Sequence, residues 1–264
     1  MDVLYGLHPV EEAVRSGGGR LDRVLLSRER GDAKLERLAR LCRENGIQVS
    51  LDGRDQLTRM AGTDMHQGAL AFVRERKFLV LEDLLGAQPR PGAQHRFFLA
   101  LDGVEDPHNL GALLRTADGA GVDGVLLPER RSAPVSGTVA KASAGASEHV
   151  RIARVTNLVR SLEQMKQSNI WVLGLDERGT PDYTNFDFRT DCVLVLGREG
   201  AGLHDLVKRT CDHLLRIPMA GKVSSLNVSV AGAVVMYEAM RQRGLAASPA
   251  AAPRQAKPRK GLGS

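Results

Sequence analysis

The sequence predicts an α/β protein with a small N-terminal domain and a larger C-terminal one. Short apolar segments typical of strands alternate with segments of helical periodicity, which favours mostly parallel sheets. The alternation degrades once, from residue 74 to residue 96, where two prolines and two glycines surround a weak helix at 81–85. We therefore expect an N-terminal domain at 1–75, a linker at 76–96 and a second domain at 97–243.

Each element of the first domain has a local signal. An apolar-periodic segment with Pro9 in its first turn predicts a helix at 8–15. Asp32 is expected to cap a second helix that ends at residue 44, before Gly46. Another short helix is expected after Asp55. The apolar segments between the helices predict strands at 21–27, 47–51 and 69–73.

The second domain repeats this alternation on a larger scale. Its apolar segments predict strands at 97–102, 122–128, 170–176, 192–197 and 213–218. Helices fill the intervals, and the last helix, at 226–243, carries the apolar stretch 228–236. The order of strands and helices therefore predicts a second α/β sheet.

Composition excludes several classes of protein. Of 264 residues, 42% are hydrophobic and 26% charged, which is typical of a soluble globular chain rather than a coiled coil or a collagen. No apolar stretch reaches the roughly 18 residues of a membrane span, and residues 1–9 lack a secretory signal, so we expect a cytoplasmic protein. Cys42, Cys192 and Cys211 are spaced for neither a disulfide framework nor a metal clip, and we expect no metal.

The net charge of +6 suggests a polyanionic partner, but much of it lies at the C-terminus. Residues 244–264 are rich in Ala, Pro and Lys/Arg, contain four cations and no acid, and lack apolar periodicity, which predicts a disordered basic tail. Without those four charges the balance is +2. Charge alone thus supports a nucleic-acid partner only weakly, and a tail that aids solubility explains it about as well.

Two familiar nucleotide motifs occur in the wrong context. Gly119, Gly121 and Gly124 match GxGxxG, yet a helix precedes them and a strand follows, the reverse of a dinucleotide-binding loop. Gly221 and Lys222 resemble the end of a P-loop that lacks its upstream glycine and its Ser/Thr. A nicotinamide oxidoreductase and a nucleotide hydrolase are therefore disfavoured.

Three polar segments follow predicted strands of the second domain. They are DPHNLGALLRTA at 106–117, VLGREGAGL at 195–203 and IPMAGKVSSLN at 217–227. Because ligands of open α/β sheets bind outside the carboxyl ends of the strands, we expect the three segments to form one site. Glycines and apolar residues suit a flat cofactor, arginine suits a phosphate or polarised oxygen, and Asn, Ser and Glu suit hydroxyl groups.

Each segment also has a purely structural interpretation. Arg115 lies among apolar helical residues and is explained equally well as a side chain that reaches solvent. The glycines around Glu199 fit a plain turn between a strand and a helix. Ser225 or Asn227 fits the N-cap of the last helix.

Taken together, the three segments resemble a known set of motifs. NLGALLRTA, LGREGAGL and IPMAGKVSSLNVSVA resemble motifs 1, 2 and 3 of the SpoU (TrmH-like) 2′-O-ribose methyltransferases of the SPOUT superfamily. The start, LYGLHPVEEAV, resembles the small substrate-binding domain of the members that act on rRNA. The resemblance covers residues 3–243, and it is strongest to members that methylate a guanosine ribose of 23S rRNA in the peptidyl-transferase P loop.

This resemblance implies a fold, a cofactor and partners. It implies a deep trefoil knot in the C-terminal domain, an N-terminal domain resembling ribosomal protein L30e, and a homodimer with the site near its interface. It also implies S-adenosylmethionine as cofactor and 23S rRNA as substrate. A tRNA ribose methyltransferase is the alternative within the family, and a non-catalytic RNA-binding or ribosome assembly factor is the alternative of another class.

The resemblance assigns roles to individual residues. The catalytic set is Asn109, Arg115, Glu199, Ser225 and Asn227. The cofactor contacts are Leu175, Gly197, Ile217, Met219 and Leu226. For RNA binding we expect the basic cluster of the N-terminal domain, opposed within its stretch only by Asp22 and Glu29: Arg15, Arg20, Arg23, Arg28 and Arg30.

Overall fold

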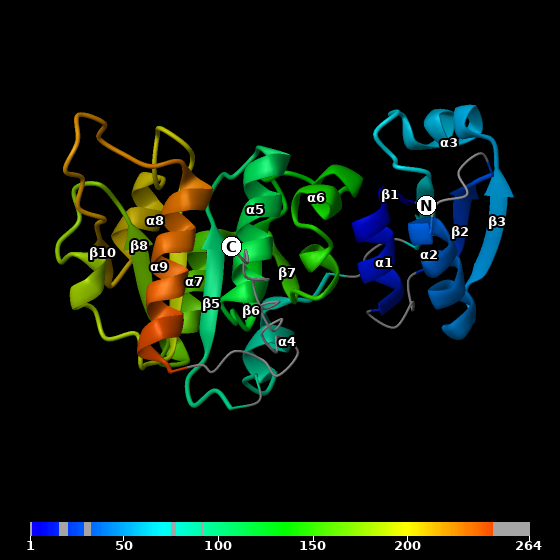
Figure 1. The fold of residues 1–264 in the computed structure, drawn as a ribbon. Helices are drawn as coiled ribbons and strands as arrows, with labels where there is room; N and C mark the ends of the chain where they lie inside the picture. Colours follow the sequence, from blue (N-terminus) through cyan, green and yellow to red (C-terminus); the bar gives the residue numbers. More distant parts are fainter. Residues whose placement is uncertain (1, 16–20, 29–32, 75–77, 91, 245–264) are drawn as a thin grey trace, which may run out of the picture.

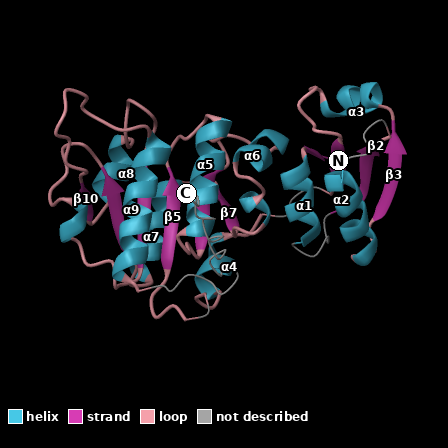
Figure 2. Cartoon of the chain, in the orientation of Figure 1, coloured by secondary structure: helices cyan, strands magenta, loops and turns pink. Residues whose placement is uncertain are grey.

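A computed structural model describes residues 2–15, 21–28, 33–74, 78–90 and 92–244, which form two lobes (Figure 1, Figure 2). The N-terminal lobe contains β1 (Asp2–Tyr5), α1 (Leu7–Arg15), β2 (Leu21–Ser27), α2 (Ala33–Glu44), β3 (Gln48–Asp52), α3 (Arg54–Ala61) and β4 (Ala69–Val73). Except for Gly244, the predicted basic tail lies outside the described residues.

The sheet of this lobe corrects the expectation of a mostly parallel arrangement. Its order is β1-β4-β2-β3, and only β2 and β3 pair in parallel, because β4 runs antiparallel to both β1 and β2. The short helix α3 follows the carboxyl end of β3 and does not carry the chain back across the sheet (Figure 1). β4 therefore starts at that end and runs in the opposite direction. The four-residue strand β1 was missed by the periodicity.

The C-terminal lobe contains α4 (Leu81–Gly86), β5 (Phe97–Leu101), α5 (Pro107–Gly119), β6 (Gly124–Pro128), α6 (Gly137–Ala142), η1 (Ala146–Glu148), β7 (Ile152–Val155), α7 (Leu158–Gln167), β8 (Trp171–Leu175), η2 (Tyr183–Asn185), β9 (Cys192–Leu196), α8 (Asp205–Thr210), β10 (His213–Leu215) and α9 (Val228–Gln242). The sheet order is β10-β8-β9-β5-β6-β7, and every one of these pairings is parallel. The prediction of a second α/β sheet is thus confirmed, with β7 as a short additional strand.

Both faces of this sheet are covered, which explains why the central strand β5 is buried along its whole length. Successive side chains of a strand point to opposite faces. Phe97, Leu99 and Leu101 pack in the core that includes residues of α5 and α9, whereas Phe98 and Ala100 pack in the core that includes residues of α4 and α7. The wholly apolar sequence of the strand follows from this double burial.

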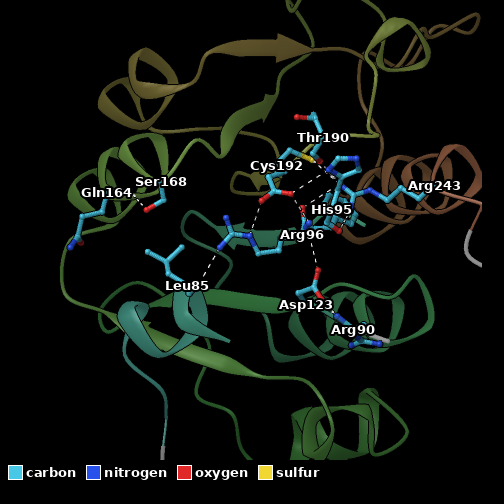
Figure 3. Close-up of polar contacts among 12 residues, drawn as sticks. Leu85, Arg90, His95, Arg96, Asp123, Gln164, Ser168, Thr190, Cys192 and Arg243 are labelled. Carbon is cyan, nitrogen blue, oxygen red and sulfur yellow. Dashed lines mark hydrogen bonds and ion pairs between the residues drawn. The ribbon is translucent and has the colours of Figure 1, made fainter. Parts of the chain in front are cut away.

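The amino edge of the sheet is tied together by buried and half-buried charges (Figure 3). Arg243, just after α9, donates hydrogen bonds to the carbonyls of His95 (2.8 Å) and Thr190 (2.7 Å), at the starts of β5 and β9. The Asp123 carboxylate accepts the backbone N–H groups of Arg90 (3.0 Å) and Phe97 (2.8 Å). The Arg243 contacts therefore fix the end of α9 against β5 and β9, and the Asp123 contacts fix the start of β6 against β5.

The two lobes meet through α6, which lies between α5 and the N-terminal lobe (Figure 1). The contact is close, because a Cβ atom at Gly137 would lie 2.6 Å from the carbonyl oxygen of Val3. Ala140 is buried in the core of the N-terminal lobe, and Glu12 lies 3.1 Å from His149. α6 therefore holds the N-terminal lobe beside the loop that connects β6 to α6, at the carboxyl edge of the sheet.

Candidate active site

Three loops at the carboxyl edge of the sheet line an open cavity of about 410 Å³. The loops follow β8, β9 and β10, the three strands on one side of β5. All the residues predicted to contact the cofactor line this cavity: Leu175, Gly197, Ile217, Met219 and Leu226. The structure thus brings together side chains and backbone that are separated by up to 51 positions in the sequence.

The loop after β9 is a tight turn that only glycine permits at its start. A Cβ atom at Gly197 would collide with the backbone of Gly202 and Leu203. Arg198 and Gly202 exchange backbone hydrogen bonds of 3.0 and 2.9 Å, while Gly202 adopts a φ of +67°, in the left-handed region. The exposed backbone of this turn forms part of the cavity wall.

Asp102 and His204 hold this turn against the end of β5. The buried Asp102 carboxylate accepts the backbone N–H of His204 at 2.7 Å, and its other oxygen lies 2.8 Å from His204 Nδ1. The sequence interpretation assigned neither residue a role. The available signal was an acid at a strand end together with a polar residue directly after the glycine turn.

Next to the cavity, Asn109, Glu199 and Asn227 form a polar network that joins the three motifs. Both asparagine amides donate to Glu199, Asn109 Nδ2 to Oε2 at 3.0 Å and Asn227 Nδ2 to Oε1 at 3.0 Å. Asn227 Nδ2 also lies 3.0 Å from Asn109 Oδ1, which accepts from it. A carboxylate whose two oxygens each accept an amide N–H is held in one orientation.

Asn227 has a structural role as well. Its Oδ1 accepts the backbone N–H of Ser229 at 2.9 Å and the Ser229 hydroxyl at 2.6 Å, so it caps the N-terminus of α9. The N-cap interpretation and the interpretation as a site residue therefore both apply to this residue. Capping fixes the side chain that also reaches Glu199.

The remaining two residues of the predicted catalytic set differ in position. Ser225 lines the cavity, as does Ser224, and its hydroxyl has no hydrogen bond to any described residue. Arg115 is exposed on α5, does not line the cavity and contacts no polar group in the described ranges, Glu199 included. Within one chain, Glu199 therefore orients two asparagines rather than Arg115.

The rim of the cavity carries an ion pair. Lys208 Nζ lies 2.7 Å from Asp176 Oδ2, and the backbone N–H of Arg178 donates to Asp176 Oδ1 at 2.9 Å. Burial of the carboxyl favours its neutral form, but the hydrogen bonds from Lys208 and Arg178 outweigh burial and lower the pKa of Asp176. Asp176 is thus an anion at neutral pH, and its charge is opposed by Lys208.

The arginines predicted to bind RNA have partners that the sequence interpretation overlooked. Arg15 forms ion pairs with Glu11 (2.5 Å) and Glu12 (3.8 Å), acids that lie just before the stretch considered. Arg23 stacks over the Phe72 ring at 4.6 Å. Arg28 donates to the Leu51 carbonyl at 3.3 Å. Arg20 and Arg30 lie outside the described residues.

Within the part of the chain that the structure covers, His, Cys, Asp and Glu side chains do not gather in a group able to hold a metal ion. Among the same residues, each helix is too short or too polar to cross a lipid bilayer.

Comparison with known proteins identifies two family domains in the chain. The SpoU rRNA Methylase family matches residues 96–237, and the domain described as RNA 2'-O ribose methyltransferase substrate binding matches residues 3–79. The first match spans the three motifs and the cavity. The second spans β1 to β4 of the N-terminal lobe.

Individual relatives match over nearly the whole chain. YacO of Bacillus subtilis, provisionally named a TrmH family tRNA/rRNA methyltransferase, is 42% identical over 92% of this chain and 96% of its own length. The 23S rRNA (guanosine-2'-O-)-methyltransferase RlmB of Escherichia coli K12 is 39% identical over 92% of this chain and 99% of its own length.

A solved structure supports the same relationship at the level of the fold. The SpoU methyltransferase AviRb from Streptomyces viridochromogenes, in complex with AdoMet, has a TM-score of 0.75 at 26% identity, covering 91% of this chain and 90% of that chain. Because family models, full-length relatives and the fold agree, the chain belongs to the SpoU rRNA methylase family.

Proposed function

We propose that this chain transfers the methyl group of S-adenosylmethionine to the 2′-hydroxyl of a guanosine ribose in 23S rRNA, in the peptidyl-transferase P loop. The observation that carries the proposal is the cavity lying against the network of Asn109, Glu199 and Asn227. A cofactor pocket and a set of hydroxyl-recognising groups are thereby adjacent. The name of the RlmB relative supports the substrate, and the AdoMet complex of AviRb supports the cofactor.

The residues of the cavity fit S-adenosylmethionine. Leu175, Ile217 and Leu226 offer apolar surface for a flat adenine ring, and the glycine turn lets a ligand approach its backbone. The volume of about 410 Å³ lies within the range of small-molecule sites, roughly 300–1,000 Å³. When bound, the cofactor supplies an electrophilic methyl group on a sulfonium.

The chain's own residues position the ribose hydroxyl. Glu199 fixes both asparagines and keeps a free lone pair on each oxygen. The second N–H of Asn109 Nδ2, the Ser225 hydroxyl and the Glu199 carboxylate are therefore groups that can bind it. Holding a nucleophile close to and in line with the methyl group can contribute about 7–11 kcal/mol to barrier lowering. Rigid positioning is therefore the main contribution that we assign to this network.

Arg115 contributes charge rather than proton abstraction. A guanidinium stays protonated in proteins, so Arg115 cannot take the hydroxyl proton, and the proton released on methyl transfer passes to solvent water. We assign it to stabilising the emerging alkoxide or to gripping the neighbouring phosphate. Since Arg115 is exposed and outside the cavity lining, it has to come close to the ribose from another direction.

In a homodimer, Arg115 of one subunit could approach the ribose bound at the other subunit. On α9, Val230 and Tyr237 lie about two helical turns apart and are 49% and 52% exposed. Ala233 and Val234, which lie between them in the sequence, are half-buried. We call these four residues the α9 stripe. An exposed apolar stripe on a helix suits a self-complementary interface. In such a dimer Arg115 of one subunit would complete the site of the other.

Replacing Arg115 tests the catalytic assignment. Arg115→Ala should bind S-adenosylmethionine with the affinity of the unmodified protein, as measured by titration calorimetry, yet methylate unmodified 23S rRNA at a rate lower by on the order of 10²-fold or more. Arg209→Ala, which removes an exposed arginine of α8 outside the cavity, is the matched control. Turnover by Arg115→Ala equal to that of the control would refute the assignment.

The substrate needs a separate experiment, because the name of the YacO relative includes both tRNA and rRNA. Ribose methylation should be mapped on total RNA from cells with and without the gene. Loss of one methylated guanosine in 23S rRNA is the expected result. Loss of a methylated tRNA position instead would support the tRNA alternative, and no change in either would favour the non-catalytic RNA-binding factor.

Several further parts of the interpretation stay proposals. These are the trefoil knot, the likeness of the N-terminal lobe to L30e, the domain boundaries and the cytoplasmic location. Their support is the family membership of the chain.

A further inference from the structure

We propose that the loop at residues 129–136, between β6 and α6, is an RNA-gripping surface in which Arg130 and Arg131 hold the phosphate backbone of the substrate. This inference rests on the proposed function, since it supplies a contact for the same RNA. It adds a surface on the C-terminal lobe to the arginines expected on the N-terminal lobe. We call residues 129–136 the arginine loop.

The arginine loop lies between the candidate active site and the N-terminal lobe. It follows β6 at the carboxyl edge, and β6 is the neighbour of β5, whose own following loop leads to Asn109. On its other side the loop enters α6, which contacts the N-terminal lobe (Figure 1). An RNA that reaches from that lobe to the cavity along this edge therefore passes the arginine loop.

The loop is anchored to the frame of the site. The backbone N–H of Ala133 donates to the Val104 carbonyl at 2.9 Å, and both residues are buried, with 1% and 4% exposure. The Ser132 hydroxyl donates to the Pro128 carbonyl at 2.7 Å, and the Glu129 N–H donates to Val155 at 2.9 Å. The backbone that carries the two arginines is thus fixed relative to β5, β6 and β7.

The two arginine side chains are exposed and form no hydrogen bond, ion pair or ring contact with the described residues. Three other exposed arginines of this lobe differ in that each is paired with a carboxylate: Arg189 with Asp187, Arg216 with Asp182 and Arg241 with Glu238. Glu129 is adjacent in sequence but makes no ion pair with either of the two. The loop therefore presents to solvent two arginines that have no ion-pair partner among the described residues, and with Glu129 its net charge is +1.

The backbone conformation adds a second, independent feature. Arg131 has a φ of +58°, in the left-handed region that residues other than Gly, Asn and Asp seldom adopt. That turn follows directly after Arg130. Such conformations concentrate at binding loops, where the surrounding structure enforces them.

Phosphodiester oxygens are the chemical match for such a pair. The guanidinium fork binds phosphate bidentately and keeps its charge at every physiological pH. Contacts of this kind set the register and orientation of the nucleic acid without reading its bases. We therefore expect the arginine loop to govern RNA affinity and its salt dependence, while cofactor binding and the chemical step stay unchanged.

The test uses the full chain and 23S rRNA transcribed in vitro, which carries no modification. Arg130→Glu/Arg131→Glu should weaken RNA binding by on the order of tenfold or more at moderate salt and lower the magnitude of the log–log salt slope by about 2. KM for the RNA should rise correspondingly with little change in kcat. S-adenosylmethionine affinity should equal that of the unmodified chain.

Matched variants keep the test decisive. Arg209→Glu reverses one exposed, unpaired arginine on α8, at the far end of that helix from the glycine turn, and should be compared with Arg130→Glu and Arg131→Glu singly. If the double charge reversal fails to fold, Arg130→Gln/Arg131→Gln replaces it, with the same direction of effect and a smaller one.

The outcomes separate this inference from the proposed function. Loss of RNA affinity with a flatter salt slope in the arginine-loop variants, beyond that of Arg209→Glu, supports the inference. If the unmodified chain methylates the RNA and the arginine-loop variants bind it like Arg209→Glu, this inference alone is overturned. If the unmodified chain neither binds nor methylates any ribosomal RNA, the proposed function fails, and the inference fails with it.

Discussion

Glu199 illustrates how a single side chain can link three distant motifs. Its two oxygens accept N–H groups from Asn109 on α5 and Asn227 at the start of α9, each at 3.0 Å. A carboxylate only accepts hydrogen bonds, whereas each amide both donates and accepts, so the three side chains fit in a single arrangement. This pattern explains why a carboxylate lies in a turn that otherwise consists of small residues.

His66 in the N-terminal lobe is another side chain whose protonation state is set by its neighbours. It is fully buried, its Nδ1 accepts the Gly68 N–H at 3.1 Å, and its Nε2 lies 3.1 Å from the Thr58 hydroxyl. Nδ1 therefore carries no proton. Burial, followed by the positive charge of Arg54, lowers the pKa of His66 below its usual 6.5.

This lowered pKa predicts that the fold weakens in mild acid. Below about pH 6.5 the unfolded chain takes up a proton at His66 that the fold resists, so stability is full above that pH and falls as the pH decreases through the folded-state pKa. Urea unfolding at pH 7.5 and 5.5 should therefore show a smaller decrease for His66→Gln than for the unmodified chain. His8→Gln, at an exposed position, is the control and should retain the full decrease.

At the scale of elements, the helix that carries two candidate site residues is positioned by a close crossing. Gly111 on α5 packs against α6 so tightly that an added Cβ would overlap the Cβ of Ala142 and lie 3.0 Å from the Ser143 nitrogen. The same helix holds Asn109 and Arg115. The glycine thus sets the distance between the site and the helix that contacts the N-terminal lobe.

Gly111→Ala should destabilise the chain by about 1–3 kcal/mol, because overpacking a tight contact forces the backbones apart. Methylation should fall as well, since Asn109 moves with α5. Gly86→Ala, where the new methyl group meets open space, is the control and should leave both unchanged. Thermal unfolding and methylation of 23S rRNA measure the two effects, and an unaltered melting temperature for Gly111→Ala would contradict the close crossing.

The elements also indicate how far the sequence alone can lead. The wholly apolar strands β5 and β9 and the amphipathic α2 were predicted, because their burial follows from their own residues. β1 (DVLY) and β7 (IARV) have four residues each, one of them charged, so they give no clear apolar pattern. The antiparallel direction of β4 follows from the end of the sheet at which the chain lies after α3. That placement depends on tertiary packing rather than on the residues of β4.

The candidate site divides in the same way. Resemblance to family motifs predicted seven of the residues that line the cavity, but not Asp176 and Lys208 at its rim, the brace of Asp102 and His204 or the pairing of Arg15 with Glu11 and Glu12. The motifs do not indicate how these side chains pair, and Asp102 and His204 are 102 positions apart in the sequence. Arg131 likewise has no sequence signal for its φ of +58°.

At the scale of the whole molecule, a single chain contains the candidate cofactor cavity but keeps Arg115 outside it. The α9 stripe lies on the helix that packs against α5, the helix of Arg115. A second copy that covers the stripe would therefore also approach Arg115. Sharing of sites between subunits is the consequence that distinguishes this proposal from a dimer in which each subunit works alone.

Mixing two inactive variants tests that sharing. Arg115→Ala keeps the cavity, whereas Leu226→Arg places a charged side chain in the cavity wall and should abolish S-adenosylmethionine binding in calorimetry. If Arg115 acts across the interface, a mixed dimer has one site with an intact cavity and an intact arginine, so random exchange of subunits restores roughly a quarter of the full methylation rate. If Arg115 acts within its own subunit, every site in the mixed dimer carries a defect and the mixture stays inactive. Adding Val230→Asp to both variants should disrupt the α9 stripe and keep the chains monomeric, which sedimentation measures. Activity should then no longer be restored on mixing. If mixed monomers still recovered activity, the shared site would be refuted.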